Sequence, residues 1–494
     1  MPAPSTSYPD LPPATPSPAL PRRVAVIGGG ITGLAAAHRL LELDPTLNVT
    51  LFESSDRLGG VLQTDARDGY LIERSADMFT TRDPWALDLC RRVGIESELI
   101  ETSPQHRRAF VVRRGRLVPV PEGFTLMSPA KVWPILKTPI LSPLGKLRLA
   151  WEYFTAARRD VTDESLASFV TRRFGREAFE RLVQPLIGGI YTADPDQLSL
   201  AATLPQFLEF EKRYGSVIRG VRASANRQAS GGRQPPGNSA SDAGARYGMF
   251  LAPRAGMGRL VSAVAAKLPA GCVRLNAAVE QITRSDSGWR LQIRGSNQPE
   301  AFDALLVTAP AHACGRLLES VDPELARLVT SVPHAGAAVV MLGYRREQVA
   351  HALDGFGFVV PAIENRQLIA CGFASVKFAG RAPEGSVLFR VFVGGALQPE
   401  LAALPDDHIQ QLVQEELAAL LGVRGEPELC EVARWLGAMP QYHVGHLDVV
   451  RQIEERAGAI PGFALAGNAY RGVGIPHCIH SGELAAERIM RVAR

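Results

Sequence analysis

The residues best placed to do chemistry are three glycines near the start of the chain. Gly28, Gly30 and Gly33 form the pattern G-x-G-x-x-G. In a nucleotide-binding turn the first glycine permits the tight turn, the second admits a pyrophosphate, and the third lets helix and strand pack closely. Glu53 follows twenty residues after Gly33, a distance at which a carboxylate accepts hydrogen bonds from ribose hydroxyls. The spacing therefore predicts a dinucleotide site.

The elements that must position this site are a strand, a helix and a second strand. Arg22–Ile27 ends in the β-branched, apolar run typical of a strand buried on both faces. Leu34–Leu43 continues at helical period, so that an anion would rest on a helix N-terminus. Val49–Phe52 is the second expected strand and leads directly to Glu53. A Gly-rich turn alone would lack this order of elements.

A second pair of glycines follows the acidic residue. Ser54, Arg57, Gly59 and Gly60 complete the pattern E-x-x-x-R-x-G-G. Paired glycines let the backbone run beside a pyrophosphate, and the arginine offers charge to it. This extension resembles the flavin-binding signature of the amine oxidase and phytoene desaturase superfamily. The resemblance implies that the dinucleotide is FAD and argues against NAD alone.

The other end of the chain supplies a matching piece. Gly462–Asn468 predicts a strand entering a glycine turn, and Gly472–Pro476 precedes a helix expected from about His477 to Arg491. The N-terminus of this helix can face the flavin pyrimidine ring, where negative charge accumulates on reduction. The first and last segments therefore build one domain, and the middle of the chain is inserted into it.

Four stretches narrow the resemblance. They are the two glycine patterns from Gly28 to Gly60, the run Gln184–Tyr191 with its continuation to Phe207, the run Arg434–His446, and Gly472–Pro476. In type and order they resemble the oxygen-dependent porphyrinogen oxidases of haem synthesis, the protoporphyrinogen and coproporphyrinogen oxidase family. Met439–His446 looks most like the bacterial members that oxidise coproporphyrinogen III.

The resemblance implies a set of contacts to the cofactor. Val279 would flank adenine through its backbone, and Trp435 would lie beside the flavin ring. Two departures from the family occur nearby, since Ser75–Ala76 replaces a Gly-Pro pair and His477 replaces an acidic residue. The expected cofactor-binding residues are Gly28, Gly29, Gly30, Ile31, Thr32, Gly33, Glu53, Ser54, Arg57, Gly59, Gly60, Ser75, Ala76, Asp77, Met78, Val279, Trp435, Gly467, Val473, Gly474 and Ile475.

The substrate side of the site is less defined by the sequence. Gly188–Gly189 is expected to break a helix, and the resemblance would then place Ile190 by the flavin. Phe356, Gly357 and Val359 are the expected wall of a flat slot, because glycine admits close approach and aromatic or aliphatic faces suit a tetrapyrrole. A core strand is the alternative for these three residues. The sequence identifies no catalytic acid or base.

The resemblance also predicts the architecture. We expect an α/β protein with a discontinuous Rossmann-like FAD-binding domain, an inserted β-sheet substrate domain and a helical, membrane-facing subdomain. Polar, proline-rich or Ser/Gly-rich composition predicts disorder in two segments. The expected boundaries are a disordered tail at 1–21, an FAD-binding domain at 22–103, 248–315 and 431–494, a substrate and helical domain at 104–214, a disordered insertion at 215–247, and a substrate-binding sheet at 316–430.

Composition excludes several classes of protein. Lys+Arg 54 against Asp+Glu 50 gives a net charge of +4, too balanced to make nucleic acid the expected partner. No apolar run reaches the roughly 18 residues of a membrane-spanning helix. Six cysteines without a CxxC pattern are typical of reduced cytoplasmic thiols. His477 and His480 have a spacing that could hold a metal, but no third ligand converges in the sequence, so no metal is expected.

One region leaves contact with a membrane open. Between Ser128 and Arg158 apolar residues recur among prolines and cations, and Trp133 and Trp151 could act as interfacial anchors. The family resemblance implies that this region approaches the membrane, and a plain helical subdomain is the alternative. The expected location is therefore the cytoplasm, with peripheral contact at the inner face of the cell membrane and a downstream haem-pathway enzyme both open as partners.

The hypothesis that unites these features is oxidation of a porphyrinogen to a porphyrin. FAD would take hydride from a methylene bridge in each of three rounds, and molecular oxygen would reoxidise it to give hydrogen peroxide. Protons can leave through the pyrrole nitrogens, so no strong protein base is required. A flavin amine oxidase or carotenoid desaturase of the same fold is one alternative, and a non-catalytic porphyrin carrier is another.

Overall fold

The computed structural model describes residues 23–492 apart from 126, 130, 132, 159, 161, 231–248 and 287. The tail expected at 1–21 lies outside the described residues, as does most of the insertion expected at 215–247. The disorder expected from 215 onward is wrong for residues 217–230, because Val217–Ser230 forms helix α10. Val217 and Ile218 are buried in the helical subdomain, and this packing offsets the weak apolar content of the rest of the helix.

A five-stranded parallel sheet forms the first layer of the fold. Its strands run in the order β12-β2-β1-β16-β22 and come from three separate parts of the chain. This arrangement confirms a discontinuous Rossmann-like domain. The strand bounds are β1 Arg23–Ile27, β2 Asn48–Phe52, β12 Val273–Arg274, β16 Ala304–Val307 and β22 Phe463–Leu465.

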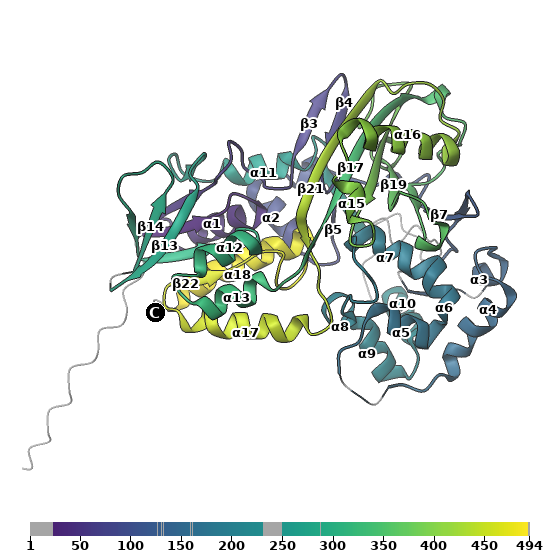
Figure 1. Ribbon diagram of the computed structural model, residues 1–494, viewed down its shortest axis with the longest axis horizontal. Coiled ribbons are helices and arrows are strands. Elements are labelled where there is room, and N and C mark those ends of the chain that lie inside the picture. Colours follow the sequence, from purple (N-terminus) through teal and green to yellow (C-terminus); the bar gives the residue numbers. More distant parts are fainter. Residues whose placement is uncertain are drawn as a thin grey trace, which may run out of the picture.

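Both faces of this sheet are covered, as its apolar strands require. Val24 and Val26 of β1 point into a core with α1 and α18, which lie side by side in Figure 1. Ala25 and Ile27 point into a second core on the opposite face. The first face carries α1 Ile31–Leu43, α2 Trp85–Val93, α11 Gly258–Ala265 and α18 Ile475–Val492; the second carries β13 Val279–Ser285, β14 Gly288–Ile293, β15 Glu300–Phe302, α12 Ala311–Leu318, α13 Pro323–Thr330 and α17 His446–Ala459.

A seven-stranded sheet is the second large element. Its order is β21-β17-β20-β19-β18-β7-β8, and the central strand pairs are antiparallel. Residues of one face pack on α16, and those of the other face pack on Tyr70 and Ile72. The bounds are β7 Phe110–Arg113, β8 Arg116–Pro119, β17 His334–Arg345, β18 Gly357–Val359, β19 Ala370–Phe373, β20 Ser386–Gly394, β21 Leu429–Pro440, α14 Ala374–Lys377, α15 Pro399–Ala402 and α16 Asp406–Leu421.

This sheet does not keep to the expected boundaries of 316–430. β21 crosses residue 431 and pairs with β17 over nine residues, so the boundary falls inside a strand. The hairpin of β7 and β8, expected in the helical domain at 104–214, forms the other edge of the same sheet. The two edges come from distant parts of the chain, and only pairing across the sheet reveals that they belong together.

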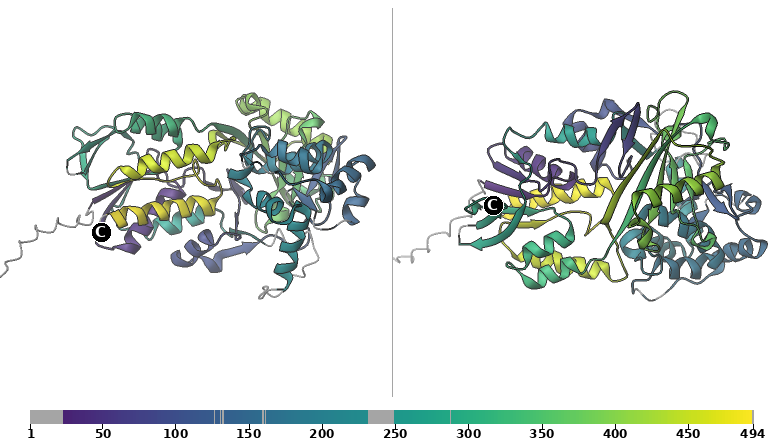
Figure 2. Two further views of the ribbon diagram at one scale, coloured as in Figure 1. Left: turned by 90° about the horizontal axis from the view of Figure 1, so that it is seen from below. Right: turned by 45° about the horizontal axis from the view of Figure 1, so that its top comes forward.

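Helices of 133–230 make the third part of the molecule, at the end opposite the parallel sheet in both views of Figure 2. They are α3 Trp133–Lys137, α4 Pro143–Ala150, α5 Leu166–Phe174, α6 Arg176–Ala178, α7 Gln184–Tyr191, α8 Leu200–Thr203, α9 Pro205–Tyr214 and α10, with a 3-10 turn at Trp151–Phe154 and a π turn at Phe179–Val183. Among the described residues no helix is both long and apolar enough to cross a membrane.

Short strands complete the fold. β3 Thr64–Arg67 and β4 Tyr70–Glu73 form a hairpin, while β5 Phe79–Thr80 and β6 Leu99–Glu101 flank β11 Phe250–Pro253 in a small sheet. β9 Phe124–Thr125 pairs with β10 Ser128–Pro129. The segment that leaves β4 contacts the seven-stranded sheet through Arg390 of β20 and Trp435 of β21.

Candidate cofactor site

The first glycine turn connects β1 to α1. Gly28 has φ 111, which favours glycine, and a Cβ added at Gly33 would lie 1.9 Å from the carbonyl oxygen of Gly28. Helix α1 can therefore approach β1 only with glycine at position 33. A Cβ added at Gly30 would meet nothing within 4 Å, so the backbone at the N-terminus of α1 is open on that side. Free backbone N–H groups at such a terminus bind anions.

The second glycine pair lies directly against the first turn. The Gly59 amide donates to the Gly29 carbonyl oxygen at 2.8 Å, and a Cβ added at Gly60 would lie 3.3 Å from Gly30 Cα. Gly59 and Gly60 both have positive φ. Two bare stretches of backbone therefore meet at Gly30 and leave a cradle that side chains would fill, which fits a pyrophosphate.

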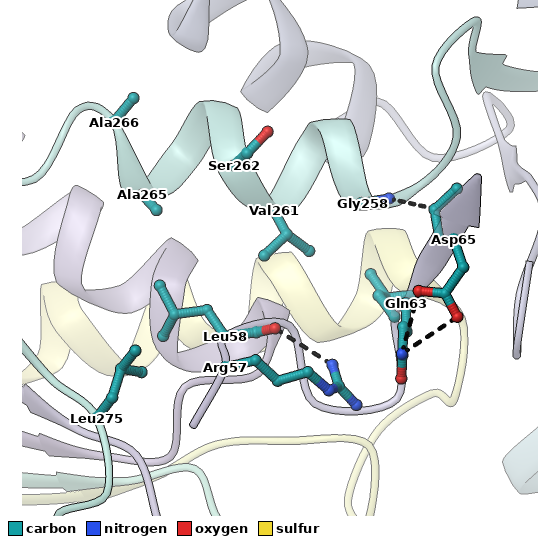
Figure 3. A pocket seen from close by; sticks show the side chains of 12 residues that line it. Arg57, Leu58, Gln63, Asp65, Gly258, Val261, Ser262, Ala265, Ala266 and Leu275 are labelled. Atoms are coloured by element: carbon teal, nitrogen blue, oxygen red, sulfur yellow. Dashed lines mark hydrogen bonds between the residues drawn. The ribbon is translucent and has the colours of Figure 1, made fainter. Parts of the chain in front are cut away.

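Arg57 lies along the same loop. Its guanidinium donates to the Gly60 carbonyl oxygen at 2.6 Å and to the Leu58 carbonyl oxygen at 3.3 Å. Figure 3 shows it beside a pocket of about 620 Å³ between this loop and α11. Of the residues expected to bind the cofactor, Arg57 is the one that lines this pocket. The pocket therefore lies beside the glycine cradle, and Arg57 stiffens the loop between them.

Glu53 is fixed at the carboxyl end of β2. Its Oε2 accepts from the Gly29 amide at 2.7 Å, and its Oε1 accepts from the Ser55 amide at 2.8 Å. The backbone of the segment before Val279 reaches the same place, since the Ala277 amide donates to the Glu53 carbonyl oxygen at 2.8 Å. The carboxylate, the first glycine turn and the start of β13 thus lie together, as a ribose and adenine site requires.

The segment 73–78 is attached to the second glycine pair. Ser75 Oγ donates to the carbonyl oxygen of Val61, and Ala76 packs against the core of the parallel sheet. Trp435 of β21 donates from Nε1 to the Arg74 carbonyl oxygen at 2.7 Å. Trp435 is thus brought to the segment expected to line the flavin, from a strand far away in the sequence.

Burial raises the pKa of the Glu73 carboxyl at the start of this segment, although Thr64 and the Met257 amide donate hydrogen bonds to it. These two donors come from β3 and from the start of α11. Glu73 therefore fixes the segment to β3 and to the residue just before α11.

The C-terminal loop 467–474 is held by a residue that the sequence did not single out. The Tyr442 hydroxyl donates to the Asn468 carbonyl oxygen and accepts from the Gly472 amide at 2.8 Å. His446 stacks on Tyr442 with ring centroids 4.0 Å apart, and its Nε2 lies 2.9 Å from the Tyr470 carbonyl oxygen. Both residues lie in Met439–His446, so the available signal was the motif itself.

The helix that follows this loop begins earlier than expected. α18 starts at Ile475 rather than near His477, and the Cys478 amide donates to the Gly474 carbonyl oxygen at 3.0 Å. Val473 and Gly474 therefore lie immediately before a helix N-terminus. The Gly467 amide donates to Ser481 Oγ at 3.1 Å, which fixes the loop to α18.

The two histidines of α18 lie against Trp85. His480 stacks on its ring at 3.9 Å, and His477 meets it edge-on at 5.4 Å. Burial lowers the pKa of both imidazoles. Within the part of the chain that the structure describes, no three His, Cys, Asp or Glu side chains are grouped to hold a metal.

The residues expected to contact substrate occupy different positions. Ile190 lies on α7, which continues through Gly188 and Gly189, so the expected helix break is wrong. A Cβ added at Gly189 would lie 3.3 Å from Val359 Cγ1, so α7 and β18 are neighbours. A Cβ added at Gly357 would lie 2.1 Å from the Cys371 carbonyl oxygen, and Phe356 is buried. The structure thus places Gly189, the neighbour of Ile190, against Val359, while Phe356 and Gly357 lie in the packing of β18.

Known proteins resemble this chain over most of its length. Residues 31–490 match the family of flavin containing amine oxidoreductases. The coproporphyrinogen III oxidase of Bacillus subtilis is 34% identical over 94% of this chain and 97% of that protein. The coproporphyrinogen III oxidase of Staphylococcus aureus is 31% identical over 95% and 99%. A mitochondrial protoporphyrinogen oxidase of Nicotiana tabacum is 30% identical over 95% of each chain.

Solved structures show the same fold. A protein of Exiguobacterium sp. 255-15 assigned as a protoporphyrinogen oxidase has a TM-score of 0.83 at 30% identity, covering 95% of this chain and 99% of its own. Reduced UDP-galactopyranose mutase has a TM-score of 0.69 at 16% identity, covering 95% and 94%, and shares the fold. With its two glycine turns, its acidic residue and its discontinuous sheet, this chain belongs to the flavin containing amine oxidoreductase family, and its cofactor is FAD.

Proposed function

We propose that this protein oxidises a porphyrinogen to the corresponding porphyrin in haem biosynthesis, with coproporphyrinogen III as the preferred substrate and protoporphyrinogen IX as the second. One observation carries the proposal: curated relatives named for these two reactions align with more than nine tenths of the chain at 30–34% identity. Solved amine oxidases such as cyclohexylamine oxidase share 14% identity, which supports the fold alone.

When bound, FAD would supply a two-electron acceptor for each of three rounds of oxidation. Oxygen is the proposed final acceptor, and hydrogen peroxide is the proposed product. The chain's own part is binding and orientation. The glycine turns at Gly28–Gly33 and Gly59–Gly60 would hold the pyrophosphate, and Glu53 would hold the ribose. No protein base is assigned, because the pyrrole nitrogens of the substrate can release its protons.

The proposed substrate slot lies where α7 meets β18. Ile190 is 43% exposed at the end of α7, and Gly189 beside it carries no side chain. Val359 lies against Gly189 from the neighbouring sheet. Phe356 and Gly357 would support this wall from behind, because they pack β18 onto the rest of its sheet.

A comparison of two substrates tests the proposal. Coproporphyrinogen III and protoporphyrinogen IX are offered separately, with a polyamine and phytoene alongside, and porphyrin fluorescence and peroxide are followed. We expect porphyrin and peroxide from both porphyrinogens, with the higher kcat/KM for coproporphyrinogen III. Higher efficiency with protoporphyrinogen IX would overturn the substrate preference. Peroxide from the amine alone would indicate an amine oxidase, and tight porphyrin binding without turnover would indicate a carrier.

We also propose that the protein works in the cytoplasm, in contact with the inner face of the membrane. The outer surface of the helical subdomain carries large exposed apolar side chains from α3, α4 and the 3-10 turn after them, with Leu144 and Phe154 more than three quarters exposed. Lys137 and Lys146 lie among them, which suits an anionic lipid surface. These apolar side chains are Trp133, Leu136, Leu144, Leu147, Trp151 and Phe154.

Sedimentation with vesicles containing anionic lipid tests this contact. Leu147→Ser with Phe154→Ser should reduce the bound fraction, whereas Leu484→Ser, which removes an apolar side chain of 50% exposure from α18, should not. Equal binding by all three proteins would exclude the helical surface as the contact. Failure of the wild type to bind would leave a haem-pathway enzyme as the partner to test on the same surface.

A further inference from the structure

A buried cluster of charges lies at the junction of the two large sheets. Asp77 follows β4, Lys377 ends α14 and Arg390 lies in β20, and their side chains are 10%, 11% and 4% exposed. Lys377 Nζ and Arg390 Nη1 both contact the same oxygen of Asp77, the arginine at 3.0 Å. Two cations therefore share one carboxylate in a place that water hardly reaches.

The surrounding groups do not cancel the excess charge. Arg381 and Glu73 are the next charged neighbours, and as one cation and one anion they offset each other. Arg381 is itself buried and donates to the Arg254 carbonyl oxygen at 2.8 Å. One positive charge in excess remains, and in a medium of low dielectric its field is weakly screened.

The cluster is attached to the segment that we propose lines the flavin. Arg390 Nε donates to the Glu73 carbonyl oxygen at 3.1 Å, and its Nη2 donates to the Ser75 carbonyl oxygen. Ser75 in turn is bonded to Val61, the residue after the Gly59–Gly60 pair. The guanidinium thus fixes the backbone path of Ser75–Ala76.

We infer that Lys377 and Arg390 are positioning residues that hold segment 75–78 against FAD and place one buried cation there, which favours the reduced, more negative flavin over the oxidised form. The inference rests on the proposed contact of 75–78 with the flavin. A fixed cation near a group that gains negative charge stabilises the charged state, because it is already oriented before the electrons arrive.

Charge deletion and charge retention at the same positions test the inference. Lys377→Met leaves a neutral Asp77–Arg390 pair, and Lys377→Arg keeps the charge. FAD-bound protein is reduced without any porphyrinogen, and its midpoint potential is measured beside the dissociation constant of FAD. In Lys377→Met we expect reduced FAD to lose at least tenfold in affinity relative to oxidised FAD, a fall of about 30 mV for a two-electron couple. Lys377→Arg should restore the potential.

Arg390→Lys separates the two roles of the arginine. It keeps the charge but loses the fork that donates to two carbonyl oxygens, so FAD should dissociate faster while the potential stays close to that of the wild type. Glu428→Gln is the control, because Glu428 joins β4 to the seven-stranded sheet through Tyr70 and Ser386, is 34% exposed, and makes no side-chain contact with segment 73–78 among the described residues. Its potential should be unchanged.

An unchanged potential in Lys377→Met, with FAD bound and only the melting temperature lowered, would overturn the inference. If Lys377→Met does not fold, Arg390→Gln deletes the other charge and should lower the potential in the same direction; an unchanged potential there would overturn it equally. The measurement uses no porphyrinogen, so its outcome is independent of whether the proposed substrate is correct.

Discussion

Replacing Tyr442 with phenylalanine tests how the C-terminal loop is held for the cofactor. In the native structure its hydroxyl bridges Asn468 and Gly472, which lie five residues before and one residue before Val473. Tyr442→Phe keeps the ring and its stacking on His446 but removes both hydrogen bonds. Only the connection between the two sides of the loop is lost.

The size of the effect follows from what the hydroxyl leaves behind. A half-buried N–H and a half-buried carbonyl oxygen lose their partner, and each such group costs roughly 1–3 kcal/mol when it is fully buried. Because the loop can relax toward water on one side, we expect the two lost hydrogen bonds to cost about 2–4 kcal/mol in total. If FAD binds only the ordered loop, this total corresponds to roughly 30- to 1000-fold weaker binding.

Titration of the apoprotein with FAD, followed by quenching of flavin fluorescence, measures this loss directly. Tyr344→Phe is the control, since Tyr344 is an equally buried tyrosine of β17 in the core beneath α16. The control should bind FAD as the wild type does. Binding by Tyr442→Phe within threefold of the wild type would show that the loop is held by other contacts and would refute the reasoning.

Three further predictions test the rest of the structure, and two of them have a control variant. Gly33→Ala should prevent FAD binding and lower the melting temperature, because its Cβ would lie 1.9 Å from the Gly28 carbonyl oxygen, whereas Gly30→Ala, whose Cβ meets nothing within 4 Å, should fold normally and still bind FAD weakly; equal melting temperatures would contradict this. Asp77→Asn should cost about 3–5 kcal/mol near neutral pH by urea unfolding. Burial alone would raise the pKa of Asp77, but Lys377 and then Arg390 outweigh it and hold the pKa below its ordinary value of 3.8. The wild-type advantage should therefore be complete above pH 3.8 and shrink as the pH falls below it, and an advantage that grows in acid would be the wrong sign. Arg173→Met removes the buried cation beside the Glu152 carboxylate, both side chains being 0% exposed, and should lower the free energy of unfolding in urea by about 3–5 kcal/mol. Arg176→Met removes an exposed pair with Glu180 and should leave the unfolding free energy unchanged.

Local patterns made the cofactor half of the site predictable. Gly28 and Gly33 meet requirements that glycine satisfies, a positive φ at the first and a close backbone approach at the second. The strand before them is buried on both faces, so its apolar run is unambiguous. Glu53 is placed by the end of β2, which is again a local feature. The flavin fold and the FAD cofactor could therefore be predicted from short stretches of sequence.

Contacts between distant segments could not be predicted in this way. In the sequence Lys377 and Arg390 look like ordinary cations of a helix and a strand, and only the fold buries them against Asp77. α10 looked too polar to order, and its packing in the helical subdomain overrode that composition. Likewise, the pairing of β21 with β17 is long-range, so local patterns did not show that β21 belongs to the seven-stranded sheet.

The sequence by itself determined the glycine turns, the strands that lead into them and the acidic residue that follows, because each depends on neighbours within a few residues. Tertiary structure alone decided which buried charges meet at Asp77, how Tyr442 closes the C-terminal loop and where α7 meets β18. These features depend on the distance between segments that are not neighbours in the sequence, and that distance is set only when the chain has folded.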